Sequence, residues 1–129
     1  MSTQVETSKA LEVAHRLVDL CREGKNVEAI NELYDENVVS LEPEGSPMGG
    51  KTVGKSAVLG NTNDWYNSVQ EIHSAYISDP IVSGNFFACA MDIDATYKER
   101  GRNEMSELGV FEVKNGKIVT TQFFYNTGN

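Results

Sequence analysis

Residues 108–126, LGVFEVKNGKIVTTQFFYN, constrain the fold more than any other segment of this chain. An Asn115-Gly116 pair separates two runs rich in Val, Ile, Phe, Thr and Tyr. Such a pair favours a β-hairpin with a two-residue type I′ turn, because both central residues of that turn need φ > 0. The turn predicts that Lys114 pairs with Lys117 and that each earlier residue pairs one step further out.

This register predicts which side chains share a face, since successive residues of a strand point to opposite sides. One face is predicted to carry Leu108, Val110, Glu112, Val119, Thr121, Phe123 and Tyr125. The other is predicted to carry Met105, Glu107, Gly109, Phe111, Thr120, Gln122 and Phe124. Both sets contain large apolar residues, so we expect both faces of the hairpin to be covered.

The composition fits one domain and argues against two classes of partner. A chain of 129 residues is long enough for one hydrophobic core, so we expect a single domain over residues 1–129. A net charge of −8 argues against nucleic acid and anionic membranes as partners. We expect no membrane-spanning segment and no signal peptide, because no long apolar run occurs and the N-terminus is polar. Cys21 and Cys89 are far apart in sequence, which favours reduced thiols and a cytoplasmic location.

Helical patterns come first along the chain and strand patterns follow. Apolar spacing predicts helices over about residues 3–23, 26–34 and 56–68. Strands are predicted at 38–41, 71–78, 85–97, 104–114 and 117–126. Residues 43–54 are rich in Gly and Pro and form either a pocket rim or an ordinary connection. This order predicts an α+β domain with helices packed on one face of a curved sheet.

The turn around Arg100-Gly101 sets the pairing of strand 85–97 with strand 104–114. We expect Glu99 to oppose Arg102, because the opposite parity would mix apolar and acidic rows on both faces. In this register the apolar face combines Cys89, Met91, Ile93, Leu108, Val110 and Phe123.

The same register gathers Asp92, Asp94 and Glu107 on the opposite face. One interpretation is a carboxylate cluster at the floor of a pocket, where repulsion and burial raise one pKa and create a general acid or base. The other is a solvated or subunit-facing surface with an Arg nearby. We expect no metal site, since the carboxylates lack a defined ligand spacing and no His is adjacent in register.

The apolar face offers a pocket for a small hydrophobic ligand if the helices cover it incompletely, and it is plain core if they cover it fully. His73 is a candidate proton shuttle only if its side chain points inward. Trp65 of the third helix is either core or a pocket wall. The sequence contains no nucleotide, metalloprotease or nucleophile motif, so we expect no cofactor.

The order of elements resembles the NTF2-like superfamily, and within it the SnoaL-like and limonene-1,2-epoxide-hydrolase-like proteins. The resemblance is sharpest at Gly101-Arg102, at the hairpin LGVFEVKNGKI and in the aromatic-rich last strand. It implies a cone-shaped α+β barrel in which three N-terminal helices pack on a curved antiparallel sheet. The concave face and the helices would enclose a pocket, and the convex face would pair two subunits. This fold hosts isomerases, cyclases, hydrolases, dehydratases and binding proteins.

The resemblance also implies which face lines the pocket. A Trp and a catalytic Asp of the epoxide hydrolases fall on Thr121 and Phe123 here, and their partner Asp and Arg fall on Ile93 and Met91. The acid–base Asp of SnoaL-type cyclases falls on Phe123 as well. All four positions lie on the apolar face, which is therefore the expected pocket side, and none of them keeps the charged residue of the family mechanism.

The leading prediction is a dimeric domain whose mostly apolar pocket binds a small hydrophobic molecule. This prediction includes the possibility that the protein also transforms the bound molecule. The expected pocket residues are Trp65, Cys89, Met91, Ile93, Leu108, Val110, Thr121, Phe123 and Tyr125. One alternative is a cofactor-independent isomerase, cyclase or hydrolase whose acid or base is among His73, Asp92, Asp94 and Glu107. The second alternative is a non-enzymatic interaction module. We expect a homodimer through the convex sheet face.

Overall fold

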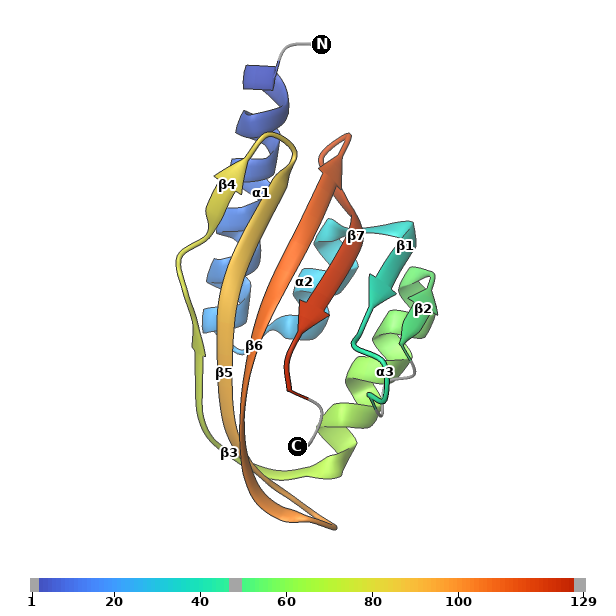
Figure 1. Cartoon of the computed structure of the whole chain (residues 1–129), viewed down its shortest axis with the longest axis vertical. Coiled ribbons are helices and arrows are strands. Elements are labelled where there is room, and N and C mark those ends of the chain that lie inside the picture. The colour runs from blue at the N-terminus through green and yellow to red at the C-terminus, as the bar shows by residue number, and fades with distance from the viewer. Residues whose placement is uncertain (1–2, 47–49, 127–129) are drawn as a thin grey trace.

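The computed structural model describes residues 3–46 and 50–126, with side chains from residue 9 onward (Figure 1). The helices are α1 (Thr3–Arg22), α2 (Asn26–Leu33) and α3 (Lys55–Ser68). The strands are β1 (Tyr34–Leu41), β2 (Lys51–Val53), β3 (Val69–Ile77), β4 (Ile81–Ser83), β5 (Phe86–Tyr97), β6 (Gly101–Lys114) and β7 (Lys117–Phe124). The three helices lie on one side of a curved sheet, as the sequence predicts.

One core joins the helices to the covered face of the sheet. Helix α1 contributes a stripe at helical spacing, and its members are Ala10, Val13, Ala14, Leu17, Val18 and Leu20. The stripe belongs to the same buried cluster as Phe87 of β5, and this ring stacks on Phe111 of β6 with centroids 4.6 Å apart. Gly24 ends the helix with φ of 76°, and the Lys25 N–H donates to the Leu20 carbonyl at 2.8 Å, the bond pattern of a Schellman cap.

The sheet is mixed rather than a simple antiparallel meander. Its strand order is β2-β1-β7-β6-β5-β3, and β4 adds to β5 beyond this path. Strand β1 pairs parallel to β7, with Ser40 opposite Thr121, while all other pairs are antiparallel. This parallel pairing places the first strand of the chain beside the last one.

The structure also contains more strand than the sequence predicts. Strand β1 begins at Tyr34, which the sequence assigns to the second helix, and β2 lies within the predicted loop 43–54. Strand β4 forms between the two strands predicted at 71–78 and 85–97. Each of these segments is stabilised by pairing with a strand that is already in the sheet, so short-range patterns underestimate it.

The closing hairpin has the predicted turn, but the predicted register fails beyond it. Both central turn residues have positive φ, 52° and 76°. Lys114 pairs with Lys117 as expected. The ladder then shifts, so that Glu112 pairs with Thr120 and Val119 becomes the extra residue of a β-bulge.

The predicted register between β5 and β6 is also wrong. The connection is the three-residue segment 98–100, and Tyr97 pairs with Gly101, whose φ is 78°. A three-residue hairpin loop commonly ends in such a left-handed residue. Arg102 therefore pairs with Thr96 instead of Glu99, and this odd-numbered shift reverses the faces of the two strands relative to the prediction.

The two register shifts cancel each other between β5 and β7, so these two strands keep their predicted faces. Only β6 presents its side chains to the faces opposite to those predicted. The covered face carries Phe87, Cys89, Met91 and Ile93 of β5, Glu107, Gly109 and Phe111 of β6, and Thr121 and Phe123 of β7. The open face, which is the convex face of the prediction, carries Phe86, Ala88, Ala90, Asp92, Asp94, Leu108, Val110, Gln122 and Phe124. The predicted carboxylate cluster is therefore split, with Glu107 alone on the covered face.

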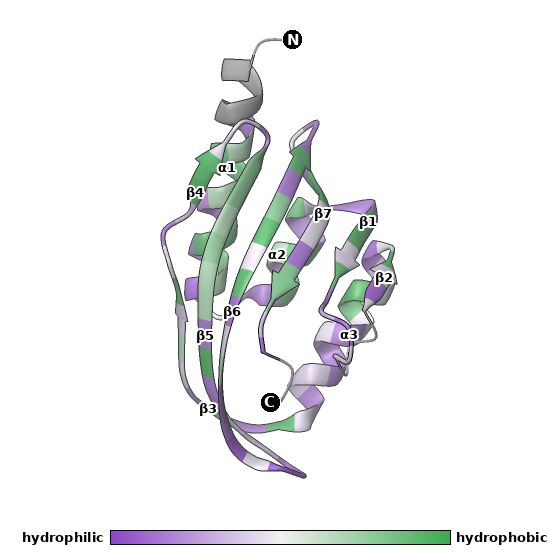
Figure 2. Cartoon of the chain, viewed as in Figure 1, coloured by the Kyte–Doolittle hydropathy of each residue, from purple (hydrophilic) through white to green (hydrophobic). Residues whose placement is uncertain are grey.

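Apolar residues are unevenly distributed along the sheet. Figure 2 shows them concentrated in β4 and the adjoining halves of β5 and β6, whereas the far end of the β5–β6 hairpin is polar. Among the described residues, no helix combines the length and the apolar character needed to cross a membrane.

Candidate functional site

A cavity of about 90 Å³ lies where α2 and α3 meet the β1–β2–β7 edge of the sheet. Its walls are Ile30, Tyr34, Ser40, Glu42, Thr52, Val58, Asn61, Thr62 and Phe123. A volume of this size holds several water molecules, at about 10–15 Å³ for each, or a molecule of a few heavy atoms. The lining combines apolar and aromatic groups with a small set of convergent polar groups, as ligand sites do.

Glu42 is the charged residue of this lining, and a hydrogen-bond chain holds it. The Tyr125 hydroxyl donates to Glu42 Oε1 at 2.5 Å. The Ser46 hydroxyl lies 2.6 Å from the Tyr125 oxygen and must donate to it, because the tyrosine has used its one proton. Burial raises the pKa of Glu42, and the bond from Tyr125 opposes that rise. Burial and the bond to Glu42 raise the pKa of Tyr125 to about 12, so it stays a donor at neutral pH.

A second polar pair lies beside this chain. Thr121 is fully buried on β7 and donates from Oγ1 to Ser40 Oγ at 2.8 Å. The parallel register of β1 and β7 places the two residues opposite each other. Ser40 lines the cavity, so this bond fixes one polar group of the wall and satisfies both buried hydroxyls.

Glu107 is the titratable group with the most unusual surroundings. It is half-buried on the covered face of β6, opposite Met91, and none of the described residues donates a hydrogen bond to its carboxyl group. Burial, and secondarily the negative charge of Glu42, raise its pKa to about 7. Burial is the main cause that raises the pKa of Tyr34, and the negative charges of Glu107 and Glu42 also raise it. Glu107, Glu42, Tyr34 and Tyr125 are therefore electrostatically coupled. Tyr34 and Glu42 line the cavity, and Glu107 and Tyr125 lie beside them without being part of its wall.

Gly109 lets the apolar part of the site close. A Cβ at this position would lie 3.0 Å from Phe111, 3.1 Å from Phe123 and 3.2 Å from Met91. The absence of a side chain allows Phe123 to lean over β6 towards Phe111, where the two rings meet edge to face at 6.0 Å. The position of the Phe123 wall thus depends on a glycine in the neighbouring strand.

The structure separates the nine predicted pocket residues into several groups. Phe123 lines the cavity directly, while Thr121 and Tyr125 act through their bonds to the lining residues Ser40 and Glu42. Cys89 and Met91 lie in or against the core, and Ile93 lies further along β5, opposite Met105. Trp65 packs edge to face on Tyr97 at 6.2 Å. Leu108 and Val110 lie on the open face, because the register of β6 is reversed.

The other three predicted acid–base residues lie on the open face. His73 lies 2.6 Å from the Thr96 hydroxyl on its Nε2 side and does not point inward. Asp94 makes two bonds to Arg102, at 3.0 and 2.8 Å, and these hold the pKa of Asp94 below its usual value. Asp92 is exposed at a groove of about 250 Å³ over β3, β5 and β6.

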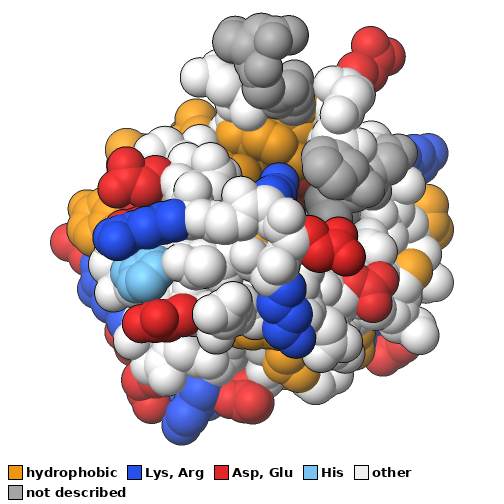
Figure 3. Space-filling model, turned by 90° about the horizontal axis from the view of Figure 1, so that it is seen from below, with side chains coloured by type: hydrophobic (Ala, Val, Ile, Leu, Met, Phe, Trp, Pro, Cys, Tyr) orange, Lys and Arg blue, Asp and Glu red, His pale blue; other side chains and the backbone are white. Residues whose placement is uncertain are grey.

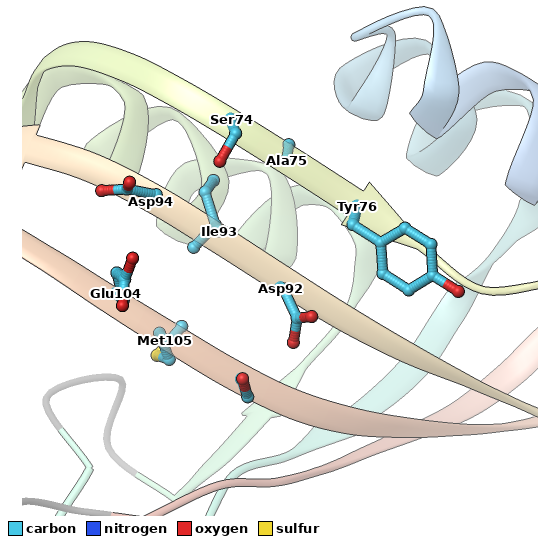
Figure 4. A pocket seen from close by; sticks show the side chains of 9 residues that line it. Ser74, Ala75, Tyr76, Asp92, Ile93, Asp94, Glu104 and Met105 are labelled. Carbon is cyan, nitrogen blue, oxygen red and sulfur yellow. The ribbon is translucent and has the colours of Figure 1, made fainter.

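Figure 4 shows Asp92, Asp94 and Glu104 along this groove, with the helices behind the strands. Figure 3 shows acidic and basic side chains interspersed over this end of the molecule. No group of three or more His, Cys, Asp or Glu side chains in the described part of the chain is placed to hold a metal ion. The groove has the mixed, solvated character of an ordinary charged surface.

The other half of the open face is apolar. Register places Leu108 of β6 between Ala90 and Phe124, and Leu108 and Phe124 are 45% and 48% exposed. Ile81 of β4 is opposite Ala88 and is 77% exposed. These exposed side chains form an apolar patch on the open face.

Sequence reasoning missed most of the cavity wall, including Tyr34, Ser40, Glu42 and Asn61. One signal was present: Val38, Ser40 and Glu42 alternate, so a strand with Val38 facing the core carries both polar residues on that same face. The contributions of β2 and α3 to the wall depend on long-range packing and leave no such pattern.

Comparison with known proteins gives one family and many solved structures. The SnoaL-like domain family matches residues 8–125. A provisionally named SnoaL-like polyketide cyclase from Mesorhizobium loti is 32% identical, with a TM-score of 0.79 over 88% of this chain and 97% of that one. A provisionally named isomerase from Bacillus subtilis is 26% identical, with a TM-score of 0.69 over 94% and 88% of the two chains.

An NTF2-like protein from Burkholderia thailandensis shares the fold at 15% identity, with a TM-score of 0.79 over 92% of this chain and 91% of that one. No curated protein matches the sequence. The predicted three-helix, curved-sheet architecture is confirmed by these structures.

Proposed function

Because this chain belongs to the SnoaL-like domain family, we propose that it binds a small, mostly apolar molecule in the cavity and transforms it by acid–base chemistry at Glu107. The observation that carries this proposal is the half-buried Glu107 carboxyl group, whose pKa is raised to about 7 by burial and by Glu42. A group with a pKa near the working pH is the most effective proton-transfer catalyst. The reaction class is an isomerisation or cyclisation that needs no cofactor.

In this proposal Glu107 takes a proton from carbon as a carboxylate and returns it as a carboxylic acid, so the protein is unchanged after each turnover. Tyr125 keeps its proton at neutral pH and holds Glu42 in place. The negative charge of Glu42 in turn helps to raise the pKa of Glu107. Phe123 occupies the position where the family resemblance implies a carboxylate, so Glu107 supplies the acidic group from a neighbouring strand.

The small cavity limits the transformed molecule, or the part of it that enters, to a few heavy atoms. A test therefore uses 2-butanone and cyclopentanone in D2O, with proton NMR following exchange of the hydrogens next to the carbonyl. We expect the wild-type protein to accelerate the exchange, and Glu107→Gln to reduce the acceleration by about 10²–10⁴-fold. Glu104→Gln, on the open face of the same strand, is the matched control and keeps the wild-type rate.

A carbon-13 NMR titration of the Glu107 carboxyl group tests the same proposal without a substrate. We expect a midpoint near the pKa of about 7. A midpoint near the ordinary value of 4.5, or exchange that persists in Glu107→Gln, would contradict the catalytic role of Glu107.

The second candidate function is a homodimer through the apolar half of the open face. The exposed side chains of Ile81, Leu108 and Phe124 support it, because they lie together on paired strands. Analytical ultracentrifugation is expected to give twice the 14.2 kDa mass of the chain. Leu108→Glu should give monomers, and Glu104→Gln, at the charged end of the same face, should not. A wild-type monomer would refute this interface. The free Cys21 and Cys89 agree with the expected cytoplasmic location.

A further inference from the structure

The charge of the cavity indicates what kind of ligand group it accepts. Glu42 is the charged residue of the described wall, which includes no Lys, Arg or His. The hydroxyl and amide groups of Ser40, Thr52, Asn61 and Thr62 supply further acceptors, although each of these groups can also donate. The wall therefore has negative charge without a positive group to balance it.

The carboxylate of Glu42 also has unused capacity for hydrogen bonds. Its Oε1 accepts the bond from Tyr125, and none of the described residues donates to its Oε2. A carboxylate has about four acceptor positions, so a ligand that donates N–H bonds can still be accommodated. Glu107 adds a second acidic group nearby, and it likewise has no donor among the described residues.

Two basic residues of the elements around the cavity, Lys55 and Lys117, are engaged elsewhere, and Lys51 of β2 is exposed and does not line the cavity. Lys55 of α3 donates to the Asn31 carbonyl at 2.9 Å and lies 3.4 Å from Glu36. Lys117 of β7 donates to the carbonyl of Glu32 at 2.6 Å. These contacts are part of how α2 and α3 are held, so the two side chains do not neutralise Glu42.

Aromatic groups complete the site. Tyr34 and Phe123 both line the cavity, and the faces of aromatic rings attract cations, most strongly where water is excluded. We infer that the cavity selects a small ligand bearing a primary ammonium group, which Glu42 binds through charged hydrogen bonds while the apolar tail packs on Phe123 and Val58. This inference rests on the proposed function, since it names the ligand class of the same cavity.

Three probes of nearly equal size test the inference: n-propylammonium, 1-propanol and propionate, each at physiological salt and neutral pH. Binding is followed by the shifts of the backbone amide resonances of Thr52 and Asn61. We expect propylammonium to bind about tenfold more tightly than propanol or better, because its bonds to a carboxylate are charge-assisted. Propionate should bind more weakly than propanol.

Glu42→Gln is the deciding variant, because its amide oxygen still accepts the bond from Tyr125 and the fold is retained. It should lose the preference for propylammonium. Glu44→Gln is the matched control, since Glu44 is an exposed residue on the same segment and the substitution changes the net charge equally. It should keep the preference, which separates local recognition from the general attraction of cations to an acidic protein.

Equal binding of propylammonium and propanol, or a preference that survives in Glu42→Gln, overturns the inference. Either result leaves the cavity as a binding site and leaves the carbonyl-exchange test of Glu107 standing. If none of the three probes shifts these resonances, the inference fails together with the proposed binding role of the cavity.

Discussion

The two faces of the β5–β6–β7 sheet place carboxylates in opposite environments. Glu107 on the covered face has no hydrogen-bond donor among the described residues and lies near a second acidic group, so its pKa rises to about 7. Asp94 on the open face lies beside Arg102, which lowers its pKa. The two side chains have almost the same chemistry. Their surroundings decide that one is suited to proton transfer and the other to an ion pair.

The same comparison holds for aromatic residues and gives the largest expected effect. Phe111 on the covered face is 1% exposed and stacks on Phe87, whereas Phe124 on the open face is 48% exposed. Phe111→Ala should lower the free energy of unfolding by about 3–5 kcal/mol, because it removes buried area and leaves a cavity. Urea denaturation measures the loss.

The control for this comparison is Phe124→Ala, measured at a protein concentration where ultracentrifugation finds monomers. It should cost less than about 1 kcal/mol, as surface substitutions usually do. Similar losses for the two variants would show that the covered and open faces are wrongly assigned.

The pH dependence of stability gives the next largest effect. Because the pKa of Glu107 is raised in the folded state, its stabilising contribution is complete below pH 4.5 and is lost as the pH rises to about 7. Glu107→Gln removes this loss, so the variant should exceed the wild-type protein in stability at pH 8 by about 1–3 kcal/mol. The two proteins should be nearly equal at pH 4.5. Urea denaturation at both values of pH measures the difference.

Asp94→Asn is the opposite case and serves as the control. A lowered pKa means that the stabilising contribution of Asp94 is present above its ordinary value of 3.8 and is lost only as the pH falls through the folded-state value. This variant should therefore follow the wild-type pH dependence between pH 4.5 and 8. If the stability of Glu107→Gln also follows the wild-type pH dependence over this range, the raised pKa of Glu107 is excluded.

Local patterns predicted the helices and the closing turn well. The apolar stripe of α1 and the Asn115-Gly116 pair involve residues that are close in sequence, so their interactions do not depend on the rest of the fold. The three-helix order and the Asn-Gly turn were enough to predict the α+β architecture.

The faces of β6 depend on two register shifts, of which the one between β5 and β6 is set locally by the three-residue loop before Gly101 and the one between β6 and β7 involves long-range contacts. The bulge at Val119 occurs where β1 pairs in parallel with β7, and β1 is itself irregular between Tyr34 and Val39. That pairing joins residues about eighty positions apart and leaves no signal near the hairpin. The two shifts placed Glu107 on the face where Leu108 and Val110 were expected, so Glu107 was predicted as a candidate acid or base but on the wrong face of the sheet.

Added volume provides a smaller test of the two faces. A methyl group at Gly109 would press on three side chains at 3.0–3.2 Å. Gly109→Ala should therefore lower stability by about 1 kcal/mol, since overpacking a closed site forces its neighbours to move. Thermal denaturation measures the change. Ala90→Val adds more volume on the open face and should change stability by less than about 0.5 kcal/mol. A neutral Gly109→Ala would mean that Phe123 can move away freely.

The smallest effect is expected for the ion pair of the open face. Arg102→Gln removes both bonds to Asp94, but the Arg102 side chain is 62% exposed, and solvent and salt screen such pairs. We expect a slight fall in the melting temperature at low salt and no difference from the wild-type protein in 1 M NaCl, where the screening length is about 3 Å. A fall as large as that of Gly109→Ala, persisting in high salt, would show that water is excluded from Asp94. The open face would then be covered in solution, and the contrast between the two carboxylates would reflect their partners alone.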